Sequence, residues 1–295
     1  MRLLTLNIYK LIGKMPPFVF SRITTSWKDY WKEKTYGEDS LIDMLDKVHF
    51  KKVASSLNIR TPTLYHQGQM DKCPPQFLSN NKIVIKKLEG KGQVYECNSK
   101  PPNLIQKSWG REKVIVEQHI SHFTESLRYP IPFDYKVYTF KGHPKYVLII
   151  NRNDEKGERA KKDKETHLLL DAETMKDVTY LMGDSRHHGK PFPKIKHKDH
   201  AIPSKVVWQS LIKNASSLGK TIFSDVFVRL DFFIDEKGPI LCELSPSPKG
   251  HWFWWFHQAR YGSKKDKSVW KQHPDKYRVL DRLCMEYKLN PSWLV

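Results

Sequence analysis

Charged residues interrupt an otherwise apolar stretch near the C-terminal end, and this feature constrains the fold most. Residues 226–250 read VFVRLDFFIDEKGPILCELSPSPKG, two apolar runs separated by the turn residues DEKG. This pattern predicts a β-hairpin. Side chains alternate between the two faces of a strand, so Arg229 and Asp231 share one face, and Glu243 is carried by the partner strand. An unpaired buried charge is costly, so we expect the charged face to form a polar site.

The same alternation sorts the apolar residues of the hairpin. In the first strand it predicts one apolar face made of Val228, Leu230, Phe232 and Ile234. In the second strand it predicts that Leu241, Glu243 and Ser245 lie on one face, with Ile240, Cys242 and Leu244 on the other.

Two carboxylates and a hydroxyl of this hairpin are candidate metal ligands. Asp231 and Glu243 come close when the hairpin closes, and like charges repel unless a cation lies between them. Mg²⁺ takes oxygen ligands, usually one or two carboxylates completed by substrate phosphates. Ser245 follows Glu243 on the same face and offers a third oxygen. The alternative is a structural Arg229–Asp231 pair with Glu243 at its rim.

Strands and helices alternate along the remainder of the chain. Extended runs at 82–87, 113–120, 133–140 and 146–151 accompany helical patterns at 46–57 and 204–219. Glycine-containing turns at 88–93 and 141–144 predict two further antiparallel hairpins. Residues 153–166 mix acidic and basic side chains and are expected to form a mobile surface loop. The fold class is therefore α+β, or mixed α/β.

Two motifs carry a resemblance to a known family. The RLD of the first hairpin strand and the ELS of the second resemble the metal-binding hairpin of ATP-grasp ligases. Residues 134–142, DYKVYTFKG, are similar to a strand of the TupA-like branch, which is associated with teichuronopeptide synthesis. The resemblance covers roughly residues 46–262. Ser245 replaces the amide ligand of the wider fold, and a hydroxyl is a weaker ligand.

The resemblance implies an ATP-grasp fold with the nucleotide held between a small central lobe and a larger C-terminal lobe. The expected boundaries are an N-terminal helical lobe at 1–75, a central lid lobe at 76–121, and a C-terminal lobe with the metal site at 122–295. The implied cofactors are ATP and Mg²⁺, with Mn²⁺ as a substitute.

Individual roles also follow from the resemblance. Cofactor-binding positions would be Lys47, Lys86, Gly90, Gly92, Glu117, Ile120, Asp134 and Lys136. Among these, the lysines and glycines would contact phosphate, and Glu117 with Ile120 would mark the strand end that binds adenine. The choice between Lys47 and Lys51 stays open. Lys136 and Arg229 would be catalytic, with Asp231, Glu243 and Ser245 as metal ligands.

The implied reaction joins a carboxylate to an amine through an acyl phosphate. The formal net charge of +19 favours an anionic acceptor, and the resemblance points to an acidic glycan, such as a uronic-acid polymer, with an amino acid or other amine as second substrate. The aromatic run HWFWWFH at 251–257 would stack on sugar rings or pack in the core. Three alternatives remain: a kinase on the same scaffold, a basic nucleic-acid-binding protein, and a catalytically inactive homologue that only binds nucleotide. Carboxylates on the strand face argue against the second.

Cysteine spacing and hydropathy predict a cytoplasmic protein. The four cysteines form no CxxC pair, and no run of about 18 apolar residues is present. Residues 1–23 mix apolar and basic side chains. Such a segment either packs against the domain or lies on an anionic membrane surface, here the inner membrane face.

Overall fold

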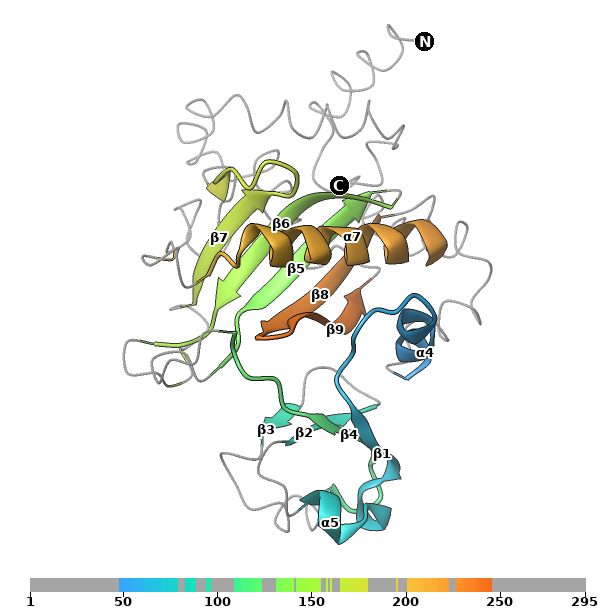
Figure 1. Ribbon diagram of the computed structural model, residues 1–295. Coiled ribbons are helices and arrows are strands. Elements are labelled where there is room, and N and C mark those ends of the chain that lie inside the picture. The colour runs from blue at the N-terminus through green and yellow to red at the C-terminus, as the bar shows by residue number, and fades with distance from the viewer. Residues whose placement is uncertain are drawn as a thin grey trace, which may run out of the picture.

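A computed structural model describes residues 48–78, 83–88, 94–96, 109–123, 131–140, 142–154, 158, 160, 165–179, 195, 201–222 and 227–245. Within these ranges the chain forms two antiparallel sheets accompanied by helices (Figure 1), which confirms the expected α+β class. The segments at 1–45, 251–257 and 265–290 lie outside the described residues.

The smaller sheet has four strands in the order β1-β4-β2-β3. They are β1 (Leu64–Gln69), β2 (Ile83–Lys87), β3 (Val94–Glu96) and β4 (Lys113–Gln118). The 3-10 turn η1 (Met70–Lys72) and the short helix α5 (Pro75–Leu78) complete this unit. Its small apolar core joins Met70 and Leu78 to β2 and β4, so the sheet has its own hydrophobic support.

The larger sheet has five strands in the order β7-β6-β5-β8-β9. They are β5 (Asp134–Phe140), β6 (His143–Asn151), β7 (Thr166–Asp171), β8 (Phe227–Asp235) and β9 (Gly238–Ser245). Helix α7 (Lys205–Ile222) crosses one face of this sheet (Figure 1). All three predicted hairpins are confirmed, as β2–β3, β5–β6 and β8–β9.

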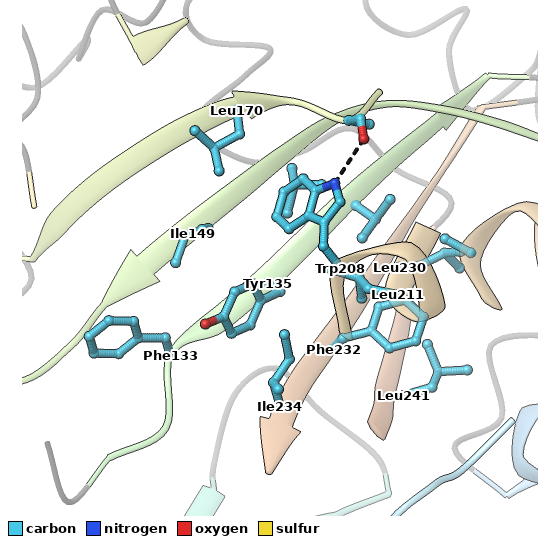
Figure 2. Close-up of a cluster of buried hydrophobic side chains, with 14 of the residues drawn as sticks. Phe133, Tyr135, Ile149, Leu170, Trp208, Leu211, Leu230, Phe232, Ile234 and Leu241 are labelled. Carbon is cyan, nitrogen blue, oxygen red and sulfur yellow. Dashed lines mark hydrogen bonds between the residues drawn. The ribbon is translucent and has the colours of Figure 1, made fainter. Parts of the chain in front are cut away.

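The main core lies between α7 and the five-stranded sheet. Leu211, Ala215 and Leu218 are fully buried, following the helical spacing expected from the sequence. Trp208 is also buried, and its indole N–H donates to the carbonyl of Ala172 at 2.9 Å (Figure 2). This core holds one face of the sheet, which leaves the opposite face of β5, β8 and β9 for polar side chains.

The predicted alternation is correct in β8 and wrong in β9. The apolar face of β8 packs in the main core as expected. In β9, however, Glu243 pairs with Asp231 while Leu241 pairs with Phe232, so Cys242 is an extra residue in the ladder. This bulge resets the alternation. As a result Leu241 and Leu244 both join the core.

Helix α4 (His49–Ser56) and the segment after it connect the two sheets. The backbone N–H of Leu241 donates to the carbonyl of Arg60 at 2.8 Å. The Arg60 guanidinium also donates to both carboxylate oxygens of Asp235, at 2.9 and 2.7 Å. These contacts attach the segment before β1 to the β8–β9 hairpin, and so hold the smaller sheet beside the larger one.

Among the helices of the described ranges, none combines the length and the apolar character that crossing a bilayer requires.

Candidate active site between the two sheets

A cavity of about 290 Å³ lies between the smaller sheet and the polar face of the larger one. Most of the site residues expected from the sequence line it: Lys86, Glu117, Ile120, Asp134, Lys136, Asp231 and Glu243. They are up to 157 positions apart in the chain, which is the distance from Lys86 to Glu243. The fold therefore collects residues of five separate strands, and of the segment that follows β4, around a single cavity.

Other expected residues are placed differently. Arg229 does not line the cavity but contacts Asp231. The backbone of Ser245 pairs with Arg229 in the hairpin, and its side chain lies outside the described residues. Lys47, Gly90 and Gly92 also lie outside the described residues.

A row of three charged residues crosses the polar face of the larger sheet. Lys136 of β5 is the direct cross-strand partner of Asp231 of β8, and Asp231 is the direct partner of Glu243 of β9. Asp231 is buried, whereas Glu243 is exposed. Directly opposed like charges destabilise a sheet, so the Asp231–Glu243 pair needs positive charge nearby.

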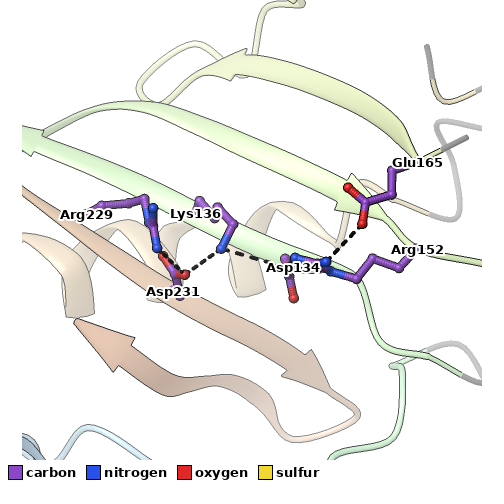
Figure 3. A network of polar contacts seen from close by, with 6 residues as sticks. All are labelled: Asp134, Lys136, Arg152, Glu165, Arg229 and Asp231. Atoms are coloured by element: carbon purple, nitrogen blue, oxygen red, sulfur yellow. Dashed lines mark hydrogen bonds and ion pairs between the residues drawn. The ribbon is translucent and has the colours of Figure 1, made fainter. Parts of the chain in front are cut away.

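Asp231 receives that positive charge from two sides. The Lys136 ammonium lies 2.5 Å from Oδ2, and Arg229 donates to Oδ1 at 2.7 Å and to Oδ2 at 2.9 Å (Figure 3). Burial alone would raise the pKa of Asp231, but the charges of Lys136 and Arg229 outweigh it and lower the pKa. Burial likewise opposes the charged form of Arg229, yet Asp231 raises its pKa. This carboxylate is therefore ionised at neutral pH.

The charged chain continues along the sheet from Lys136. Its ammonium is 3.7 Å from Oδ2 of Asp134, which accepts hydrogen bonds from Nε and Nη2 of Arg152 at 2.9 and 2.6 Å. Arg152 also donates to Glu165 at 3.0 Å (Figure 3). Glu165 is 6% exposed, so the expectation of a surface loop at 153–166 is wrong at this residue. Its buried charge is stabilised by Arg152, a long-range contact that local composition does not reveal.

A second charged cluster lies on the opposite wall, in the smaller sheet. Glu117 is 2% exposed and pairs with Lys86 at 3.1 Å and with Lys51 at 3.7 Å. Burial acts against the charge of Lys86, but Glu117 prevails and raises its pKa. For Lys51 burial dominates and lowers the pKa. The Lys51 ammonium donates to the carbonyl of Pro62 at 2.8 Å and does not line the cavity.

Apolar side chains complete the cavity near the linker between the sheets. Val84, Ile120 and Phe233 line it, together with Cys242, whose position results from the bulge in β9. Burial raises the pKa of the Cys242 thiol to about 12, so the thiol stays protonated and behaves as an apolar group. The sequence patterns did not identify Cys242, Arg152 or Glu165 as residues of this site. An irregularity of one residue leaves no signal in a hydrophobic pattern.

The carboxylates beside the cavity could hold Mg²⁺ only if a bound substrate supplied further ligands. Within the described ranges no three His, Cys, Asp or Glu side chains gather closely enough to hold a metal. Asp231 and Glu243 nevertheless form an adjacent carboxylate pair beside a cavity. Because Mg²⁺ is commonly held by one or two carboxylates plus substrate phosphates, these residues fit a metal that arrives with a phosphate ligand.

Comparisons with known proteins give structural neighbours of one kind. No family model matches the sequence, and no curated protein matches it significantly. Similar solved structures include a D-alanine–D-alanine ligase from Bacillus anthracis complexed with ATP, at 12% identity, with 69% of this chain and 54% of that chain covered and a TM-score of 0.42. Another is an L-amino acid ligase from Bacillus licheniformis, at 11% identity, 71% and 42% coverage, and a TM-score of 0.44.

A third is the ATP-grasp ligase PsnB complexed with a minimal precursor, at 10% identity, 69% and 52% coverage, and a TM-score of 0.44. The present chain thus spans about half the length of these proteins. Likeness at this level assigns no substrate, so the case for a function depends on the residues of the cavity.

Proposed function

We propose that the protein is an ATP-grasp enzyme that uses MgATP to activate a carboxylate and joins it to an amine. The observation that carries this proposal is the charged row Lys136–Asp231–Glu243, which faces the Lys86–Glu117 pair across one cavity. Cations on two walls suit a polyphosphate, and the carboxylate pair suits its metal ion. Lobes bounded at 1–75, 76–121 and 122–295 are part of the proposal.

The nucleotide would lie with its base toward the linker and its phosphates toward the charged walls. Ile120, Val84 and Phe233 offer apolar contacts to a purine ring, while backbone groups at 117–120 would bind its edge. Lys86 and Lys136 would contact phosphate oxygens, with Gly90 and Gly92 letting backbone N–H groups approach them. Asp134 would orient Lys136. Lys47 remains a further candidate for a phosphate contact, whereas Lys51 donates to the carbonyl of Pro62 and does not line the cavity.

Asp231 and Glu243 would hold Mg²⁺, with Ser245 as a weaker third ligand. When bound, the metal neutralises charge on the phosphate oxygens. Mn²⁺ is expected to substitute, because it accepts the same oxygen ligands.

The chain's own residues would bring the reactants into line and balance their charge. An oxygen of the carboxylate substrate forms a bond to the γ-phosphorus, the bond from that phosphorus to the bridging oxygen breaks, and ADP leaves. The amine nitrogen then attacks the acyl carbon, phosphate departs, and the amine loses a proton to solvent. Lys136, which lines the cavity, would stabilise the negative charge that develops on the transferred group and the acyl oxygen. Arg229 does not line the cavity, and it would assist through its contact with Asp231.

For the substrates, we propose an acidic glycan or its precursor as the carboxylate, and an amino acid or other amine as the second substrate. The net charge of +19 supports an anionic substrate, and the TupA-like motifs support a uronic-acid class. Residues 1–23 would assist by contacting an anionic membrane surface, if the glycan is assembled there.

The test follows ADP release in the presence of hydroxylamine, a small amine that traps acyl phosphates as hydroxamates. A pool of uronic-acid oligosaccharides and amino acids supplies the carboxylates. Equal amounts of ADP and hydroxamate, abolished in Glu243→Gln, are expected. Glu236→Gln is the matched control, because Glu236 is an exposed glutamate in the turn of the same hairpin. ADP release without hydroxamate, accompanied by a stable phosphate ester, would instead identify a kinase.

A further inference from the structure

Lys136 lies where a cation bound to Asp231 would lie. Its ammonium is 2.5 Å from Oδ2 of Asp231, and Arg229 donates to both oxygens of the same carboxylate. Both Asp231 oxygens therefore have cationic partners already (Figure 3). A metal ion that used Oδ2 would compete directly with the ammonium of Lys136.

We propose that Lys136 is an internal cation that excludes free divalent metal from the site, so that metal enters only together with a polyphosphate. This inference rests on the proposed function and adds to it an order of binding. The ammonium is exchanged for the metal at Asp231, and phosphate oxygens take over the ammonium.

Lys136 is suited to this exchange, and Arg229 is not. The lysine carries a point charge on a flexible four-carbon stem, while Arg229 makes two hydrogen bonds in a fixed fork. Asp134, with Oδ2 at 3.7 Å from the ammonium, provides a second carboxylate toward which Lys136 can swing. The Lys136 side chain is 13% exposed and lines the cavity, so incoming phosphate can reach it.

A metal ion that binds without a nucleotide brings no phosphate groups to accept hydrogen bonds from the displaced Lys136 ammonium. A metal ion alone would displace Lys136 from a buried carboxylate and leave the ammonium without its closest partner, which is costly. The exposed Glu243 remains accessible, but a single exposed carboxylate binds a divalent cation weakly. Phosphates remove the penalty because they accept hydrogen bonds from the displaced ammonium.

The experiment measures Mn²⁺ binding by calorimetry and by the loss of the free-ion paramagnetic signal, first with Mn²⁺ alone and then with Mn²⁺ and ADP. Lys136→Met should bind Mn²⁺ alone at least tenfold more tightly than the wild type, and MnADP at least tenfold more weakly. Lys136→Arg, which retains a cation, should keep metal affinity at the wild-type level. Lys176→Met is the control for net charge, because Lys176 is exposed and does not line the cavity.

Opposite changes for Mn²⁺ and MnADP are the signature of the exchange. Equal or weaker binding of Mn²⁺ alone by Lys136→Met, in a protein whose wild type binds MnADP, would overturn this inference and leave the proposed function standing. Failure of the wild type to bind MnADP and MgADP would overturn both. Lys136→Gln, of similar size but polar, carries the same test if the methionine variant does not fold.

Discussion

The two walls of the cavity hold charge in different ways. At the smaller sheet, the buried carboxylate of Glu117 pairs with Lys86 of β2 and with Lys51 of helix α4, so this cluster has more positive than negative charge. On the larger sheet, carboxylates and cations alternate in a series of paired side chains whose formal charges cancel. The series is Glu165, Arg152, Asp134, Lys136, Asp231 and Arg229. The exposed Glu243, the cross-strand partner of Asp231, adds a further negative charge to this wall.

This difference explains how one cavity can accept both a polyanion and a metal ion. The surplus on the smaller sheet attracts phosphate without prior rearrangement. The alternating series holds each of its carboxylates in an ion pair, and it must exchange one of these pairs before a metal can bind. Substitutions in the two walls should therefore have different effects on stability and on ligand binding.

The largest effect is expected from Asp231→Asn. The change leaves Lys136 and Arg229 facing a neutral amide, and breaking a buried ion pair costs about 3–5 kcal/mol. Loss of a proposed metal ligand should also reduce ADP release by about 10³-fold, the upper end for removal of one electrostatic stabiliser. Urea unfolding and a coupled ADP assay check both. Normal activity in a variant that unfolds as early as expected would remove Asp231 from the metal site.

Glu117→Gln should have the next largest effect, about 2–3 kcal/mol, because charged hydrogen bonds are lost and two lysines stay partly buried without their carboxylate. Nucleotide affinity is a second readout, measured by calorimetry at constant ionic strength. Because the proposed metal ligands lie on the larger sheet, Glu117→Gln should leave the affinity for free Mn²⁺ unchanged. A loss of Mn²⁺ binding would contradict the division of roles.

Glu165→Gln, at the far end of the series of paired charges, should lower the free energy of unfolding by a smaller amount, about 1–2 kcal/mol. Arg152 keeps its hydrogen bonds to Asp134, so only one charged contact is removed. Thermal unfolding monitored by circular dichroism measures the change. If Glu165→Gln destabilised the protein as much as Asp231→Asn does, the paired charges from Glu165 to Arg229 would act as one cooperative network and not as separable pairs.

The smallest effect is expected for Asp235→Asn, a matched aspartate on β8 outside the cavity. Burial opposes ionisation of Asp235, but the hydrogen bonds and charge of Arg60 lower its pKa. Arg60 is 41% exposed, so the pair contributes at most about 1 kcal/mol. A lowered pKa stabilises the fold above the ordinary carboxyl value near 4, and this contribution disappears as pH falls through the folded-state pKa. In urea unfolding, the difference in stability from the wild type should therefore be smaller at pH 3 than at pH 7.

The sequence predicted most of the strands from local patterns, and several of the residues that it singled out line the cavity. Alternation identified the apolar face of β8 and the carboxylates of the hairpin, and glycine-containing turns identified the hairpins. The bulge at Cys242 was not predictable, since a single extra residue is compatible with the same letters. The pairing of Glu165 with Arg152, and of Lys51 with Glu117, depends on how distant segments pack, which composition does not encode.

Binding of a nucleotide to the cavity is the central claim, and calorimetric titration with ADP tests it without any knowledge of the acceptor. The wild type should bind one ADP in the presence of Mg²⁺ and bind it at least tenfold more weakly after chelation of the metal. Lys86→Met should weaken binding in both conditions, and Glu243→Gln should abolish the dependence on Mg²⁺. Absence of binding to the folded wild type, or binding that is unchanged by Mg²⁺ and by Lys86→Met, would contradict the assignment of this cavity as a MgATP site.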